Sequence, residues 1–273
     1  MLHTSKIKAN LFAILFFSLL TSCSRLDKVV TIEDAAPDKH IDVSNIPNAK
    51  PKAEPKSRYG NPESYVVFGK RYYVKDSSKG YVETGIASWY GTKFHGRRTS
   101  SGETYDMYAM TAAHKTLPLP TYVEVTNLNN GRSIIVKVND RGPFHENRII
   151  DLSYTAAIKL DIVKKGTGLV KVRAINPKNK QDDLVRDQVK ETIKTNTNFY
   201  IQVGTFSELR NAKMMRQKLS SFGSNLVKIS DVVISGETLY RVLIGPFTDS
   251  NISDEIVSKL SSFDIFEYRI VIK

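Results

Sequence analysis

The sequence predicts a protein of mixed class, in which a small all-β domain with one short helix precedes an α+β domain. Strand-like alternation and turn signals run through residues 82–175, whereas residues 197–273 show strand and helix patterns in the order βαββαβ. A strongly polar stretch at 176–196 separates the two patterns and is expected to be a linker. The length of 273 residues leaves room for one large or two small domains.

The composition is that of an ordinary globular protein with a basic charge. The hydrophobic fraction is 41%, the charged fraction is 25% and the formal net charge is +12. A positive charge favours anionic partners such as nucleic acid, anionic lipid or cell-wall polymer. The lysines and arginines are scattered, so simple solubility explains the charge equally well.

The N-terminal residues 1–22 have the pattern of a lipoprotein signal peptide. Lys6 and Lys8 precede an apolar run at 11–20 that is too short for a comfortable membrane span. Residues 20–23 (LTSC) resemble a lipobox, so we expect Cys23 to be acylated after cleavage. Cys23 is the sole cysteine, which excludes an internal disulfide; an uncleaved anchor or an incidental thiol is the alternative. Ser24 after the cysteine favours the outer membrane of a Gram-negative cell.

Residues 24–57 are polar, contain four prolines and lack apolar periodicity, so we expect a tether over residues 23–64. Residues 65–81 contain two short β-rich runs and are expected to be an extension of the β domain, giving it the bounds 65–175.

The β domain shows its elements in order. Val123 and Val125 alternate with polar residues, and the pair Asn130-Gly131 predicts a hairpin turn because both residues tolerate a positive φ. Alternation resumes over 134–138, and 170–174 predicts a closing strand. Ser153 is expected to cap a short helix that carries Ala156, Ala157 and Leu160.

The C-terminal domain reads as a four-stranded antiparallel sheet with both helices on one face. Strands are predicted at 198–206, 225–234, 237–247 and 266–273. The first helix is predicted over 207–222 with Ser207 as its cap and Gly223 ending it, and the second over 250–261. The apolar face of the first helix is expected to be core and not a cofactor site.

Five ionisable residues lie among apolar, glycine and turn residues instead of on an evidently solvated surface: Glu103, Asp106, His114, Asp140 and Arg141. Asp140 follows a predicted strand and precedes the Arg141-Gly142-Pro143 turn, so its carboxyl group can project from a rigid rim. The alternative is a turn aspartate bonded to backbone amides. One histidine among dispersed acids makes a metal site unexpected, and we expect no cofactor.

These residues belong to blocks that resemble the rare lipoprotein A (RlpA) family. The blocks are ASWYG (87–91), FHGRRT (94–99), GETYDM (102–107), TAAHKTLP (111–118), VTNLNNGRS (125–133), VNDRGPF (138–144) and IDLSYTAA (150–157). The resemblance covers about residues 82–175. It implies a double-psi β-barrel and, in active members, lytic cleavage of peptidoglycan glycan strands.

That cleavage breaks the β-1,4 bond between N-acetylmuramic acid (MurNAc) and N-acetylglucosamine (GlcNAc), with attack by the MurNAc 6-hydroxyl and formation of a 1,6-anhydro sugar. One carboxyl group can protonate the leaving oxygen and then accept the hydroxyl proton. Asp140 is our candidate for it. The resemblance implies roles in activity for Glu103 and Asp106, and His114 could orient a carboxylate. Without the resemblance, a solvated acid pair and a structural histidine are the simpler interpretations.

Sugar contacts are expected in both domains. Trp89 and Tyr90 could stack on sugar rings, although a core position for Trp89 is equally compatible with the sequence. Arg141 could contact the muramic lactyl carboxylate or pair with an acid. The blocks YIQVGTF and YRVLIGPF resemble the SPOR domain family, which binds glycan stripped of its stem peptides. Strand alternation then puts Tyr200, Gln202 and Arg241 on the open face of that sheet.

Two functions follow from these expectations. The first is an outer-membrane lytic transglycosylase that faces the periplasm and is brought to denuded septal glycan by its SPOR domain. The second is a non-catalytic glycan-binding lipoprotein of the division site. Expected partners are denuded glycan strands, the membrane through Cys23, and division-site proteins. The secretion signal and the missing RNA-binding aromatic pattern argue against nucleic acid.

Overall fold

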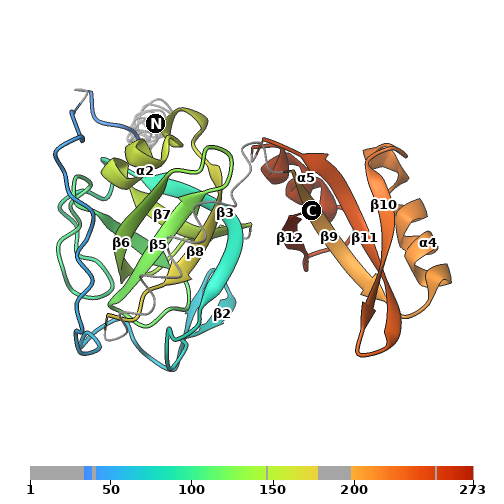
Figure 1. Ribbon diagram of the computed structural model, residues 1–273, viewed down its shortest axis with the longest axis horizontal. Helices are drawn as coiled ribbons and strands as arrows, with labels where there is room; N and C mark the ends of the chain where they lie inside the picture. Colours follow the sequence, from blue (N-terminus) through green and yellow to red (C-terminus); the bar gives the residue numbers. More distant parts are fainter. Residues whose placement is uncertain (1–33, 39–40, 146, 178–197, 250, 273) are drawn as a thin grey trace, which may run out of the picture. The chain divides into compact units, whose positions relative to one another are not determined.

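The computed structural model describes residues 34–38, 41–145, 147–177, 198–249 and 251–272 (Figure 1). The expected signal peptide, the lipidation site Cys23 and residues 178–196 of the expected linker lie outside these ranges. The described residues form a barrel domain and a C-terminal sheet domain, joined through residues outside the described ranges.

Six strands close into a barrel. They are β3 (Val82–Tyr90), β4 (Thr111–His114), β5 (Thr121–Asn127), β6 (Ser133–Asp140), β7 (Arg148–Ser153) and β8 (Gly168–Ala174), in the order β3-β7-β4-β6-β5-β8. The pairs β3–β7 and β4–β6 are parallel, and the other neighbours are antiparallel. This closed barrel of mixed pairing confirms the double-psi fold that the resemblance implied.

Alternation along each strand sends one set of side chains inward. Val123, Val136 and Val172 are among the residues buried in the barrel core. The predicted hairpin joins β5 to β6, with Thr126 opposite Ser133 and Gly131 at a φ of +74°. Because the inward phase is filled with aliphatic groups, chemistry in this domain must use the outward phase, the loops and the rim.

A short helix, α2 (Tyr154–Leu160), follows β7 directly. The Ser153 hydroxyl accepts a hydrogen bond from the backbone N–H of Ala156, which confirms the predicted cap. Ala156, Ala157 and Leu160 are buried against the barrel core. The 3-10 turn η1 (Val163–Lys165) then leads to β8.

Two further strands, β1 (Ser64–Val67) and β2 (Lys70–Tyr73), form an antiparallel ribbon, as expected for the extension. The Tyr65 hydroxyl donates to the backbone oxygen of Lys115 at 2.6 Å, which ties the ribbon to the barrel.

The segment expected to be a polar tether differs from the prediction over residues 41–61, which we call the barrel strap. The Ala49 N–H donates to the Ile135 oxygen at 3.0 Å, and the Ser57 N–H donates to the Leu119 oxygen at 2.8 Å. Ile46 and Ala49 also pack against the barrel core. The strap looked like a tether because it is held by backbone hydrogen bonds and a few side chains, which leave little periodicity in the sequence.

The C-terminal domain is a four-stranded antiparallel sheet with two helices. Its strands are β9 (Phe199–Phe206), β10 (Val227–Ile234), β11 (Glu237–Phe247) and β12 (Arg269–Ile272), in the order β10-β11-β9-β12. Ala212 and Leu219, in and directly after helix α4 (Leu209–Lys218), share one buried cluster with Ile256 and Leu260 of α5 (Asn251–Ser261) and with Phe199 of β9. Both helices therefore cover one face of the sheet, as predicted.

The start of α4 differs in detail from the prediction. Ser207 is not the cap: the helix begins at Leu209, Glu208 occupies the cap position and no side chain makes a capping hydrogen bond. After Lys218 the chain tightens into the 3-10 turn η2 (Ser220–Phe222), and Gly223 follows with a φ of +99°.

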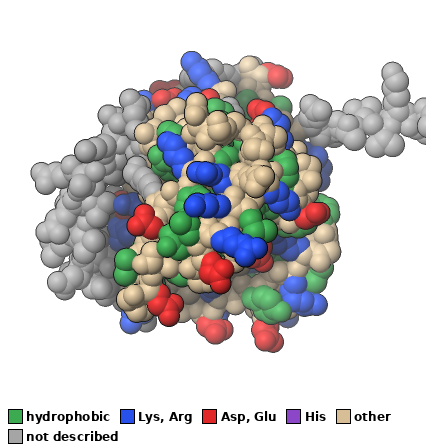
Figure 2. Space-filling model, turned by 90° about the vertical axis from the view of Figure 1, so that its right-hand side faces the viewer, with side chains coloured by type: hydrophobic (Ala, Val, Ile, Leu, Met, Phe, Trp, Pro, Cys, Tyr) green, Lys and Arg blue, Asp and Glu red, His purple; other side chains and the backbone are tan. Residues whose placement is uncertain are grey.

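The outer side of α4 is basic, with Arg210, Lys213, Arg216 and Lys218 exposed. Figure 2 shows lysine and arginine side chains gathered on the face that α4 and β10 present.

Among the described residues, no helix is both long enough and apolar enough to cross a bilayer.

Candidate active site on the outer face of the barrel

Asp140 ends β6 at a bulge. The register between β4 and β6 shifts after Ala112, so Ala113 pairs with Asp140 and Asn139 becomes the extra residue. Oδ1 of Asp140 accepts hydrogen bonds from the Ser100 N–H and hydroxyl, both at 2.7 Å, and from the Arg141 N–H at 2.8 Å. The backbone of the loop before Glu103 therefore fixes this carboxylate on a rigid strand end.

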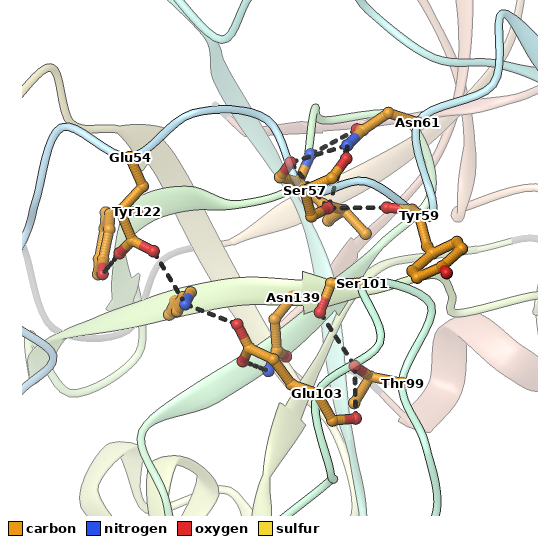
Figure 3. A network of polar contacts seen from close by, with 11 residues as sticks. Glu54, Ser57, Tyr59, Asn61, Thr99, Ser101, Glu103, Tyr122 and Asn139 are labelled. Carbon is orange, nitrogen blue, oxygen red and sulfur yellow. Dashed lines mark hydrogen bonds and ion pairs between the residues drawn. The ribbon is translucent and has the colours of Figure 1, made fainter.

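Glu103 lies in a polar network that also includes the barrel strap (Figure 3). Its carboxylate accepts from the Asn139 side-chain amide at 2.8 Å and from Lys137 Nζ at 2.7 Å. Lys137 also reaches Glu54 at 3.3 Å, and Glu54 accepts from the Tyr122 hydroxyl. Burial opposes the charge of Lys137, but the two carboxylates outweigh it and raise the lysine pKa. Glu103 is thus held as one member of an ion network.

Asp106 is separate from that network. Its Oδ1 accepts from the Tyr108 N–H at 2.9 Å and lies 3.8 Å from Nδ1 of His95. Both side chains of this pair are about half exposed. Glu103 and Asp106 are close in the sequence, but they make their hydrogen bonds and ion pairs with different residues.

His114 is buried at the end of β4, and its ring is held by backbone groups. The side chain is 3% exposed, and Nδ1 accepts from the N–H groups of Thr116 and Leu117 at 3.1 and 3.0 Å. Nε2 lies 2.7 Å from the Tyr81 hydroxyl. Burial, with the nearby charges of Arg141 and Lys115, lowers the pKa of His114 to about 3. The ring stays neutral and shapes the 114–117 turn.

The side chain of Arg141 also makes its hydrogen bonds to backbone groups. Its guanidinium donates to the oxygens of Gly60 at 2.6 and 2.9 Å, Leu117 at 2.6 Å and His114 at 3.1 Å. The expected contact with a muramic carboxylate is not what this geometry supports, because the donors point at carbonyl groups of the strap and of the 114–117 turn. Arg141 therefore ties the strap and the 114–117 turn to the end of β6, next to Asp140.

The two aromatic candidates differ. Trp89 is half-buried and packs on Tyr154, with ring centroids 5.6 Å apart. Tyr90 is 7% exposed and stacks on Tyr105 at 4.1 Å, so its ring face is not open to a sugar. The Tyr90 hydroxyl is buried, and within the described parts of the chain it has no hydrogen-bond partner of acceptable geometry. The same is true of the nearby Thr111 hydroxyl.

Sequence reasoning did not single out Asp151 or Ser88. Asp151 lies on β7 between the buried residues Ile150 and Leu152, so it takes the outward phase of that strand. Its Oδ1 accepts from the hydroxyl of Ser88 on β3. The signal was present: in RIIDLS a lone acid alternates with buried aliphatic residues, which is unusual for a solvated carboxylate.

The open face of the C-terminal sheet carries the predicted glycan contacts. Gln202 of β9 pairs with Arg269 of β12, and its amide donates to Thr205 at 3.0 Å. Thr205 pairs with Arg241 of β11. Tyr200 has the same phase as Gln202, opposite to the buried residues 199, 201 and 203. The structure brings the three predicted residues to one face.

Two family models match this chain. A model described as lytic transglycolase covers residues 82–173, and a SPOR domain model covers residues 195–264. The first contains the barrel strands up to residue 173 and every candidate acid, and the second contains most of the sheet domain.

Relatives match over most of the chain. "Endolytic peptidoglycan transglycosylase RlpA" of Vibrio cholerae is 44% identical over 233 residues, which is 84% of this chain and 84% of the relative. The protein of the same name from Pseudomonas aeruginosa is 41% identical, covering 78% of this chain and 76% of the relative. The crystal structure of the RlpA SPOR domain from Pseudomonas aeruginosa is similar at 27% identity and a TM-score of 0.25, over 27% of this chain and 96% of that one. The identity and the coverage of these relatives place the chain in the RlpA family.

Proposed function

We propose that this protein is an endolytic peptidoglycan transglycosylase that cleaves MurNAc–GlcNAc bonds in denuded glycan strands and leaves 1,6-anhydro-MurNAc ends. The observation that carries the proposal is the family relationship over both domains, with the candidate acids of the barrel intact. The reaction needs a proton for the leaving oxygen, an acceptor for the proton of the 6-hydroxyl, and negative charge beside the developing oxocarbenium ion.

The barrel supplies groups of this kind on its outer face. Asp140 is fixed at a strand end by three donors, so it costs little reorganisation when charge develops near it. Glu103 and Asp106 lie on the neighbouring loop and are proposed as accessory acids. His114 and Arg141 support the site by holding the 114–117 turn and the strap in place.

The C-terminal domain binds the substrate in this proposal. Tyr200, Gln202 and Arg241 offer an aromatic ring, an amide and a cation on one sheet face, which suits a chain of hydroxyl, acetamido and carboxylate groups. Recognition of denuded glycan would concentrate the protein at the division septum, where division proteins are further proposed partners.

The proposed anchor is lipid on Cys23, in the outer membrane facing the periplasm. Two or more acyl chains hold a protein stably on a bilayer. Labelling with a radioactive fatty acid is expected to mark the parent protein and to leave the Cys23→Ser protein unmarked. Label that remains on the variant would show that the lipobox reading is wrong.

The test of the activity uses purified residues 24–273, which keep the barrel strap, and glycan strands stripped of stem peptides. Mass spectrometry is expected to find 1,6-anhydro-muramyl products from the parent. Asp140→Asn should lower their rate at least about 100-fold, because acid/base or electrostatic groups commonly contribute that much. Equal products from both proteins would remove Asp140 from the chemistry. Binding without any products would support the alternative of a non-catalytic glycan-binding lipoprotein.

A further inference from the structure

Three neighbouring strands place two carboxylates on either side of one alanine. Ala113 of β4 pairs with Asp140 of β6 on one side and with Asp151 of β7 on the other. Directly paired residues share a face of the sheet, and neighbouring strands lie about 4.8 Å apart, so the two aspartate Cα atoms are about 10 Å apart. Ala113 packs with Tyr90 and Tyr105 and not with the barrel core, so this face is the outer one.

The chain after Asp140 folds back toward Asp151. A Cβ atom placed on Gly142 would lie 3.7 Å from the Ala113 Cβ and 3.8 Å from Oδ2 of Asp151. The φ of Gly142 is +139°, a conformation that other residues rarely adopt. Glycine therefore leaves space beside Oδ2 that any other residue would reduce.

Tyr90 lies near both acids. Burial is the main reason that its pKa is raised far above the usual range, and the charges of Tyr105, Asp140 and Asp151 add to the effect. Its buried hydroxyl has no hydrogen-bond partner of acceptable geometry among the described residues. Tyr90 therefore belongs to the same cluster as the two acids, with the Thr111 hydroxyl beside its own.

The two acids differ in their surroundings. Oδ1 of Asp140 is occupied by three donors. Within the described ranges, Asp151 receives one side-chain hydrogen bond, from Ser88, which is 1% exposed. Burial raises the pKa of Asp151, although the Ser88 hydroxyl and the charges of Arg148, Lys115 and His145 lower it. A carboxyl group that keeps its proton is suited to protonate a leaving oxygen.

We propose that Asp151 is the acid/base of the reaction and that Asp140 is the fixed negative charge beside it, an inference that rests on the proposed transglycosylase function. The Asp151 carboxyl gives its proton to the glycosidic O4 of GlcNAc as the bond from C1 of MurNAc to O4 breaks. The cation that forms at C1 is stabilised by Asp140. The MurNAc 6-hydroxyl oxygen then bonds to C1, and its proton returns to the Asp151 carboxylate, so no water is consumed.

The first experiment compares substitutions by their product rates on denuded glycan, using residues 24–273. Asp151→Asn is expected to lower the rate at least about 100-fold, with thermal unfolding and glycan pull-down unchanged. Asp151→Glu keeps the acid and should recover part of the rate. An active parent together with a fully active Asp151→Asn protein overturns this inference alone, whereas an inactive parent overturns the proposed function.

The second experiment separates a chemical role from a structural one by a matched pair. Ser88→Ala removes the side-chain donor of Asp151, and Ser100→Ala removes the side-chain donor of Asp140. The basic limb of the pH–rate profile reports loss of the proton from the acid. It should move up by about one pH unit in Ser88→Ala, because a lost hydrogen bond to the charged form favours the protonated one. A limb that moves only in Ser100→Ala, or in neither protein, contradicts the assignment to Asp151.

Discussion

The barrel and the C-terminal sheet obey the same strand alternation, but their outward-facing residues end up in different surroundings. Ser88, Ala113 and Asn139 point out of the barrel, yet they are only 1%, 4% and 2% exposed. Ala113 packs against Tyr90 and Tyr105, and Asn139 bonds to Glu103. Tyr200 and Gln202 point away from the helices of the C-terminal domain and stay partly exposed. The barrel therefore holds its polar groups in a second layer fixed by hydrogen bonds, whereas the sheet leaves its polar groups open to a polymer.

The largest effect that would test this difference is expected at Arg141. Arg141→Met removes a guanidinium that satisfies three backbone carbonyls, and it should lower the free energy of unfolding of the barrel by about 3 kcal/mol. Trp89 is the sole tryptophan, so its fluorescence in a urea titration reports the barrel without the C-terminal domain.

The matched control is Arg97→Met, which removes an exposed arginine from the same domain. It should change the free energy of unfolding by less than about 0.5 kcal/mol. Equal effects from the two substitutions would mean that loss of positive charge, and not loss of the backbone contacts, destabilises the barrel.

A smaller effect is expected from pH. The folded pKa of His114 is about 3 and the ordinary value is about 6.5, so between these values the unfolded chain binds a proton that the folded barrel does not. Stability should therefore rise with pH across this window, by up to about 1.4 kcal/mol per pH unit.

His114→Gln should remove this slope, measured by Trp89 fluorescence in urea at several pH values. Asp151 acts in the opposite sense, because its raised pKa lets the folded barrel keep a proton that the unfolded chain loses. Asp151 is present in both proteins, so its contribution cancels when the pH dependence of the His114→Gln protein is subtracted from that of the parent. A parent slope that persists unchanged in the variant would assign it to other groups.

The smallest effect is expected on the open sheet. Arg241→Ala should weaken binding of denuded glycan about 5–10-fold, the loss of roughly one ordinary hydrogen bond, with no change in unfolding. Lys213→Ala on the outer side of α4 is the charge-matched control and should bind as the parent does. If both substitutions weaken binding equally, the interaction depends on net charge and the sheet face is not the specific site.

Several elements of the fold could be predicted from neighbouring residues, whereas closure of the barrel was expected only from the family resemblance. The Asn130-Gly131 turn, the Ser153 cap and the aliphatic alternation over 134–138 each depend on neighbouring residues, and each was found where predicted. The strap could not be predicted, because its contacts with Ile135 and Leu119 join residues far apart in the chain and leave no periodic pattern.

The site was predicted less completely than the fold. The sequence identified Asp140 and Glu103, and the structure puts both on neighbouring segments. It could not show that Arg141 and His114 point at backbone groups, since that depends on where the chain returns after the Gly60 and 114–117 segments. Asp151 was overlooked because it lies mid-strand, and its neighbours across the sheet, Ser88 and Ala113, come from separate strands.

The contacts of Asp34 and of the barrel strap also set a working distance. Asp34 accepts hydrogen bonds from the N–H groups of Gly91 and Lys93, at 2.9 and 3.1 Å. With a lipid on Cys23, eleven residues before Asp34, the barrel can move no farther than about 40 Å from the bilayer surface while these bonds hold. If the chain from Asp34 through Asn61 detached from the barrel, the extended chain between Cys23 and the barrel would span about 130 Å. Under the proposed anchoring at Cys23, the contacts at Asp34 and along the strap would therefore determine how much of the wall above the membrane one molecule can reach.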